Sequence, residues 1–416
     1  MRRRSAFTLV EVLVSMALIL FIMSILAAAF GAASQAVSDL KAAGDLAEKL
    51  RGATNVLKFD LEADHFTDST ATSVKLSDSS FWNRLTVPAP PSPVGFFRIT
   101  EGGAATNEGN DLDGIPSYFQ TNTSLSYTIA LHGTHRSDFL SALVTGTSAL
   151  LQPSPTGPYA NLDNFYQDPV AAGASSGVFS SQFAEVEVFL GPTGDTTDNT
   201  TGPARPLFAL YRRQQLAVPK SWTQTAAITA GEANFDYEMS MWNNAFNTMQ
   251  DLSMPVKRFQ CNGAAGLPPA GGYQPIQPPN TAADLLMTDV LSFDVRVLVS
   301  GGSDFEDLFQ LYDNNGTNIP SRKNPKTGLP WYFPFNNNAF GGALVFDTWT
   351  NQIYPAPPAA PVYDYSNWQT AGTATSIPMF KDNNGNPISI QAIQITLRVW
   401  DFKTKKTRQV TIVQQM

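Results

Sequence analysis

The feature that most constrains this chain is an uninterrupted apolar run close to its N-terminus. The run extends from Phe7 to about Gly31 and reads FTLVEVLVSMALILFIMSILAAAFG. As a helix, about 25 residues cover roughly 37 Å, which is long enough to cross a lipid bilayer. Three arginines, at positions 2 to 4, precede the run. Because basic flanks stay on the cytoplasmic side, we expect the N-terminus in the cytoplasm and the rest of the chain outside it.

One acidic residue, Glu11, breaks the apolar run. A carboxylate without a partner is costly inside a membrane, so this residue needs a partner or a role. Taken alone, a glutamate satisfied by water at the membrane surface explains it as well as a functional role does. Its neighbours decide between the two, because the string from Ala6 to Glu11, AFTLVE, resembles the processing site of type IV prepilins.

The resemblance implies a processed N-terminus. In that family a prepilin peptidase cuts in front of the phenylalanine and methylates the new amine, so cleavage here falls between Ala6 and Phe7. Glu11 then occupies the fifth position of the mature chain and can pair with the Phe7 amine of a neighbouring subunit. Two charges that are costly in an apolar medium neutralise each other only when the neighbour is in register. The family usually has glycine before the cut, and this chain departs from it with Ala6.

Two other interpretations of the first segment stay open. A secretory signal peptide cut after Ala27-Ala28-Ala29 would fit the small residues there. A plain single-pass anchor would fit the apolar length. Neither predicts FTLVE at this place.

From Gln35 to about Phe66 the helical pattern continues and becomes amphipathic. No proline occurs before Pro88, so we expect one helix from Phe7 to about His65, roughly 90 Å long. A pilin has such a helix, with a first half in the membrane or filament and a second half on a sheet, so the resemblance extends to this segment. The predicted packing stripe consists of Val37, Leu40, Ala43, Ala47, Leu50, Ala53, Leu57 and Leu61.

Beyond residue 66 the sequence predicts strands and turns, with proline-rich loops between them. We therefore expect an α+β protein in four parts: a leader (1–6), a transmembrane or filament-core helix (7–31), its amphipathic continuation (32–66) and a large antiparallel β head (67–416) outside the cytoplasm. The expected strands are Ser124–Leu131, Phe183–Leu190, Pro206–Val218, Val290–Val299, Ala343–Thr348, Ile388–Val399 and Arg408–Val413.

Segments near both ends of the head resemble particular subclasses. Leu57–Glu62, Leu285–Arg296 and the closing hairpin Ile393–Ile412 are similar to segments of J-type minor pseudopilins of type II secretion and of W-type minor pilins. The resemblance implies a structural subunit and not an enzyme. Its implied partners are the prepilin peptidase, other minor pilins or pseudopilins, the major subunit, the inner-membrane assembly platform and membrane lipid. A head of this size would stack poorly in a filament shaft, which favours a low-copy role in initiation or at the tip.

Acidic loops offer one candidate for metal binding. The segment Asn107–Gly114 reads NEGNDLDG, and clustered side-chain oxygens beside glycine suit Ca²⁺. Asp111 and Asp113 are the first candidates for its ligands. The same residue types are also ordinary turn formers, and the segment has no terminal bidentate glutamate at the spacing of a complete Ca²⁺ loop.

Two patterns that suggest catalysis or metal binding have plainer explanations. Gly173–Gly177 matches G-x-S-x-G, but a nucleophile elbow needs a strand before it and a helix after it, and here a strand is expected next. His132 and His135 are three residues apart in a glycine-containing loop, with no third ligand fixed by spacing. We interpret the first as a turn and the second as surface histidines.

The remaining polar features also favour simple readings. Cys261 is the single cysteine and is expected to be a free, partly buried thiol. The lysines at 403, 405 and 406 and Arg408 fit a solvated turn better than a site for an anionic polymer. With a net charge of −8, the chain has no overall electrostatic reason to bind nucleic acid.

Two alternatives belong to other functional classes. A membrane-anchored envelope enzyme or binding protein should show a pocket with converging polar groups in its head. A DNA-uptake pilin should show a continuous basic stripe there.

Overall fold

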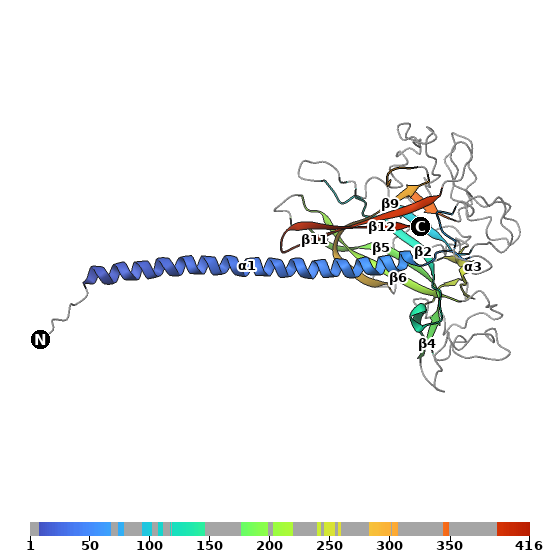
Figure 1. The fold of residues 1–416 in the computed structure, drawn as a ribbon, viewed down its shortest axis with the longest axis horizontal. Coiled ribbons are helices and arrows are strands. Elements are labelled where there is room, and N and C mark those ends of the chain that lie inside the picture. Colours follow the sequence, from blue (N-terminus) through green and yellow to red (C-terminus); the bar gives the residue numbers. More distant parts are fainter. Residues whose placement is uncertain are drawn as a thin grey trace.

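The computed structural model describes a long helix attached to a β-rich head (Figure 1). The described residues are 8–67, 74–78, 94–101, 107–110, 117, 119–145, 176–198, 203–218, 239–242, 245–253, 257–258, 283–300, 302–306, 344–348 and 389–416.

Helix α1 (Leu9–Glu62) is continuous over 54 residues, as the sequence predicts. Thr8 caps its N-terminus, because the Thr8 hydroxyl accepts a hydrogen bond from the Glu11 amide at 3.3 Å. The helix ends where Ala63 turns to extended backbone (φ −67°, ψ 155°), three residues before the expected end at His65.

The head is built on one antiparallel sheet of eight strands in the order β10-β1-β2-β5-β6-β9-β11-β12. Strands that are close in sequence are mostly neighbours, and the C-terminal strands β11 and β12 form the closing hairpin that the sequence predicts. The bounds are β1 Phe97–Glu101, β2 Ser124–Ala130, β5 Phe183–Thr196, β6 Pro206–Ala217, β9 Asp284–Val299, β10 Leu344–Asp347, β11 Ile390–Asp401 and β12 Lys406–Gln415.

Smaller elements complete the described head. A two-stranded sheet pairs β3 (Leu140–Thr145) with β4 (Ser176–Ser181), and another pairs β7 (Met241–Trp242) with β8 (Ala245–Phe246). A 3-10 turn (Arg136–Asp138) and the short helix α3 (Met249–Leu252) lie between strands. All seven strands expected from the sequence are confirmed to within a few residues at most ends, but β5 and β9 are six residues longer. Strands β1, β3, β4, β7 and β8 lie outside the seven expected ranges.

Only the last part of α1 packs on the sheet, against β9, β11 and β12. Leu50, Ala53, Leu57 and Leu61 are buried there, so the C-terminal half of the predicted stripe is confirmed. The N-terminal half is mostly wrong: of its four residues only Ala43 is half-buried, because that part of the helix turns Ser38 and Ala42 toward the head instead. Val37 is 67% and Leu40 is 73% exposed, Ala47 is also exposed, and Leu46 packs against the core.

The two faces of the sheet differ in character. The face that receives α1 is apolar, with the paired residues Phe293↔Leu397 and Val295↔Ile395 in the core. The opposite face is polar although it is buried, because alternate residues of the same strands point there. Its buried polar residues include Arg98, Ser126, Glu185, Glu187, Arg213, Gln215, Ser292, Asp294 and Thr396.

A glycine is required at the point where the chain enters β1. Gly95 has φ +113°, and a Cβ built on it would lie 2.2 Å from the His65 carbonyl oxygen and 2.7 Å from the Thr128 hydroxyl. We expect Gly95→Ala to lower the free energy of unfolding by roughly 1–3 kcal/mol, because both the backbone and the space exclude a side chain. Gly44→Ala is the control, since it lies in α1 with nothing within 4 Å and should stabilise slightly. Urea unfolding of the two variants in detergent would check this, and an equal effect of both substitutions would contradict it.

Candidate membrane and assembly interface

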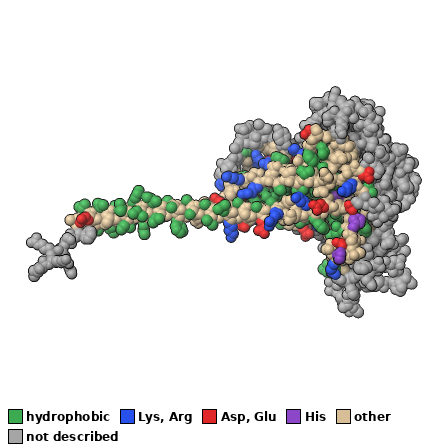
Figure 2. All heavy atoms as spheres, in the orientation of Figure 1, with side chains coloured by type: hydrophobic (Ala, Val, Ile, Leu, Met, Phe, Trp, Pro, Cys, Tyr) green, Lys and Arg blue, Asp and Glu red, His purple; other side chains and the backbone are tan. Residues whose placement is uncertain are grey.

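The N-terminal part of α1 exposes an unbroken apolar surface. An 18-residue stretch has a mean hydropathy of 2.7, and 0% of it is buried in the protein. Leu9 is 77% and Phe30 is 81% exposed. Figure 2 shows this segment as an apolar stalk that projects from the head. A surface of this kind is stable only when lipid or other apolar helices cover it.

Glu11 lies at the free end of this stalk. Its Oε2 accepts hydrogen bonds from the Thr8 amide at 2.9 Å and from the Thr8 hydroxyl at 3.0 Å. Together with the bond from the Glu11 amide to the Thr8 hydroxyl, these contacts form a capping box. Both side-chain bonds use the same carboxylate oxygen, so within the described part of the chain Oε1 is left to accept a further donor. Ala6 and Phe7, the predicted processing residues, lie outside the described residues.

The other end of α1 is fixed to the sheet by a buried ion pair. Asp60 is 0% exposed and accepts two hydrogen bonds from Arg212 of β6, at 2.6 Å from Nε and 2.8 Å from Nη2. The Tyr127 hydroxyl of β2 donates a longer bond to the same carboxylate at 3.5 Å. Because Asp60 lies on the packing face between Leu57 and Leu61, this contact fixes the rotation of the helix against the sheet.

Burial dominates the electrostatics of this pair. It raises the pKa of the Asp60 carboxyl, and the hydrogen bonds and charge of Arg212 offset part of that rise. Burial also works against the charge of Arg212, but the hydrogen bonds and charge of Asp60 outweigh it and raise the pKa of the guanidinium. Each charge therefore depends on the other, and removal of either one leaves a buried charge uncompensated.

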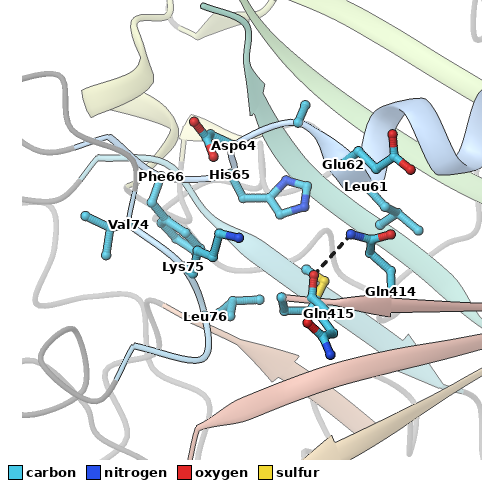
Figure 3. A pocket seen from close by; sticks show the side chains of 12 residues that line it. Leu61, Glu62, Asp64, His65, Phe66, Val74, Lys75, Leu76, Gln414 and Gln415 are labelled. Atoms are coloured by element: carbon cyan, nitrogen blue, oxygen red, sulfur yellow. Dashed lines mark hydrogen bonds between the residues drawn. The ribbon is translucent and has the colours of Figure 1, made fainter.

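A small pocket lies where α1 meets the last residues of the chain (Figure 3). It measures about 70 Å³, well below the roughly 300 Å³ at which small-molecule sites begin, and it has room for a few water molecules. Residues from three segments, 61–66, 74–76 and 414–416, line it. Its size gives no support to the alternative of a ligand-binding head at this place.

His65 is the buried ionisable group beside this pocket. Its Nδ1 lies 2.8 Å from the Thr128 carbonyl oxygen, and its ring packs against Phe97 and Tyr127 with centroids 5.1 and 5.0 Å away. Burial lowers the pKa of His65 from 6.5 to about 4, although the bond to Thr128 and the charge of Asp64 act in the other direction. The imidazole is therefore neutral at physiological pH.

The structure separates the residues that resembled catalytic or metal sites. His132 pairs with Asp64 at 2.7 Å, whereas the His135 amide donates to Asp138 at 2.8 Å at the start of the 3-10 turn. Ser176 and Gly177, at the end of the G-x-S-x-G match, belong to strand β4, so no helix follows the candidate serine. Among the described residues, no group of three or more His, Cys, Asp or Glu side chains could hold a metal ion. Asp111, Asp113 and Cys261 lie outside the described residues.

Glu108, in the segment proposed for Ca²⁺, has a structural role that the sequence did not reveal. Its side chain is 1% exposed and accepts hydrogen bonds from Arg205 at 3.2 Å, from the Ser292 hydroxyl at 3.0 Å, and from Arg398. Arg398 also lies over the Phe119 ring at 4.5 Å from its centroid. Two guanidinium groups thus occupy this carboxylate, and Glu108 fastens its loop onto the polar face of the sheet.

Comparison with known proteins bears on the first part of the chain. Residues 1–27 match the family model described as the prokaryotic N-terminal methylation motif. Neither the curated proteins nor the solved structures include a match to this chain. The motif, the exposed apolar helix and the antiparallel head together are those of a type IV pilin-like protein. The motif implies processing by a prepilin peptidase and assembly with other pilins, and the apolar helix fits a single-pass membrane anchor.

Proposed function

We propose that this protein is a minor pilin or minor pseudopilin that acts in the initiation or at the tip of a type IV pilus or type II secretion filament. The observation that carries the proposal is the apolar stalk of α1, which has no covering within the described chain and begins inside the matched motif. The precursor sits in the inner membrane with its N-terminus in the cytoplasm and its head outside. In the filament, helices of neighbouring subunits replace the lipid.

Processing and register involve the three residues at the start of the stalk. The peptidase cuts between Ala6 and Phe7, and Phe7 receives the methyl group. Glu11 then accepts the Phe7 amine of the next subunit through Oε1, while Oε2 keeps its bonds to Thr8. This division of the carboxylate supports the proposal, because one glutamate can cap its own helix and pair with a neighbour at the same time.

A position at the tip follows from the size of the head. The proposed head, residues 67–416, contains far more chain than the helix that carries it. Subunits in a shaft stack at a close repeat, and a large head obstructs that repeat. The closing hairpin and the Leu285–Arg296 strand also resemble J-type minor pseudopilins and W-type minor pilins, and both resemblances favour a low-copy subunit.

Mass spectrometry of the mature N-terminus, with protein from the native host, tests the processing step. We expect a chain that begins at N-methyl-Phe7. A chain that begins after Ala29, or an uncut chain that begins at Met1, would contradict the proposal and favour a secreted or simply anchored protein.

The assembly role of Glu11 has a separate test. We expect Glu11→Ala to be processed but to fall at least about tenfold in the sheared filament fraction, since an unpaired amine in an apolar bundle is costly. Glu48→Ala is the matched control, because this acid is exposed on the same helix. Equal incorporation of both variants would exclude a register role for Glu11, and abundance equal to the major subunit would exclude the tip position.

A further inference from the structure

The turn between β11 and β12 lies at the end of the head that faces the apolar stalk. In Figure 1 it points back along α1 toward the N-terminus. The Lys403 amine donates a hydrogen bond to the Ser38 hydroxyl of α1, which fixes the turn against the helix. Ser38 is eight residues beyond Phe30, a distance of about 12 Å along the helix. The turn therefore sits just beyond the segment that would span the membrane.

This part of the surface combines basic and exposed apolar side chains. Figure 2 shows Lys and Arg side chains gathered where the stalk meets the head. Phe402 is 49% exposed beside Lys403, and Val37 and Leu40 project from α1 within one turn of Ser38. We call the following set the collar: Val37, Leu40, Lys41, Phe402, Lys403 and Lys406.

Most acidic residues near the collar already have hydrogen-bond or ion-pair partners. Asp39, next to Ser38 on α1, accepts a hydrogen bond from the Gln35 side chain at 2.9 Å. Asp401 accepts hydrogen bonds from the Lys403 amide at 2.9 Å and the Thr404 hydroxyl at 2.7 Å, so it holds the turn together. Asp198 pairs with Lys405 at 2.6 Å. Within the described chain, Lys41 and Lys406 have no carboxylate partner. The collar is thus locally basic in a chain whose net charge is −8.

We propose that the collar seats the head on an anionic lipid surface before the subunit enters a filament. The phosphate headgroups extend about 5–7 Å beyond the hydrocarbon on each side, and a phenylalanine or lysine side chain at the collar reaches that layer. Aromatic side chains favour this interface, and lysines bind anionic headgroups there. A solvated turn would account for the lysines, but not for the exposed Phe402, Val37 and Leu40 at the same level.

The contact would orient the head against the membrane. A single helix leaves a subunit free to rotate and tilt, whereas a second contact beside it limits both motions. The proposal rests on the proposed membrane anchorage of α1.

Depth-dependent quenching of a fluorophore tests the collar. The full chain, with Cys261→Ser and Phe402→Cys labelled with a nitrobenzoxadiazole dye, is reconstituted in nanodiscs whose headgroups carry nitroxide. Leu143→Cys is the matched control, because Leu143 is similarly exposed (56%) on β3, in a two-stranded sheet separate from the main one. We expect at least twofold stronger quenching at position 402 than at 143 in discs that contain phosphatidylglycerol. Lys403→Glu with Lys406→Glu should reduce it to the level of the control.

The possible outcomes distinguish a failure of the collar proposal from a failure of the proposed membrane anchorage. A chain that does not copurify with nanodiscs overturns the membrane anchorage and the collar together. A chain that copurifies but shows equal quenching at 402 and 143 overturns only the collar. Quenching at 402 that is equally strong in neutral phosphatidylcholine discs overturns the preference for anionic lipid.

Discussion

Asp60→Ala should lower the free energy of unfolding by about 3–5 kcal/mol, the largest effect that we expect from a single substitution. The substitution leaves the Arg212 side chain, which is 11% exposed, without the carboxylate that accepts its bonds at 2.6 and 2.8 Å. A buried guanidinium without a counter-charge has lost its hydration and gains no ion pair in return. Most of this desolvation cost therefore lowers the stability of the folded state. Urea unfolding in detergent micelles, followed by near-ultraviolet circular dichroism, measures the loss.

Two controls separate the ion pair from the rest of the helix. Glu62→Ala removes an exposed acid one position beyond the buried face and should change stability by less than about 0.5 kcal/mol. The double variant Asp60→Leu/Arg212→Met replaces the pair with apolar side chains and should be more stable than Asp60→Ala alone. If Asp60→Ala and Glu62→Ala have equal effects, the pair does not hold the helix on the sheet.

Acidification should destabilise the head through His65. The folded state binds a proton to this histidine only near pH 4, whereas the unfolded chain does so near pH 6.5. Between these values the unfolded state holds more protons, so the free energy of unfolding falls as the pH falls through this window. The shift corresponds to about 3 kcal/mol, present above pH 6.5 and lost by pH 4.

Carboxyl groups titrate in part of the same range, so the test compares two proteins. His65→Gln keeps a side-chain amide that can bond the Thr128 carbonyl but has no titration of its own. We expect this variant to lose the His65 share of the pH dependence, measured by urea unfolding from pH 4 to 7.5. Identical pH profiles for the two proteins would show that His65 does not control the acid response.

The sequence was most informative where a single local rule decides the structure. The apolar run and the motif from Ala6 to Glu11 predicted the stalk, because membrane length and charge cost need no tertiary partner. The alternation of β11 and β12 predicted the closing hairpin for the same reason, since each strand must present one apolar face. Periodicity also predicted the packing stripe of α1, but it could not tell that the helix turns Ser38, and not Val37 or Leu40, toward the head.

Local sequence patterns did not indicate the contacts between segments that are distant in the chain. Glu108 and Arg398 are separated by 290 positions, and each looks like an ordinary surface residue in its own segment. Asp60 could have been noticed, because a charge between Leu57 and Leu61 on an apolar stripe needs a buried partner. Its partner Arg212 could not, because β6 contains another arginine, Arg213, that points to the opposite face of the sheet.

The contacts between α1, at the start of the chain, and the last strands of the head have a consequence for biogenesis. The helix is made first, yet it packs on β9, β11 and β12, and Ser38 meets Lys403 across 365 positions. In a head exported through the membrane, the apolar face around Leu57 stays uncovered until those late strands have crossed. Completion of export and closure of the helix on the sheet thus become a single event, and a chain interrupted before β11 keeps a face that proteases and chaperones recognise.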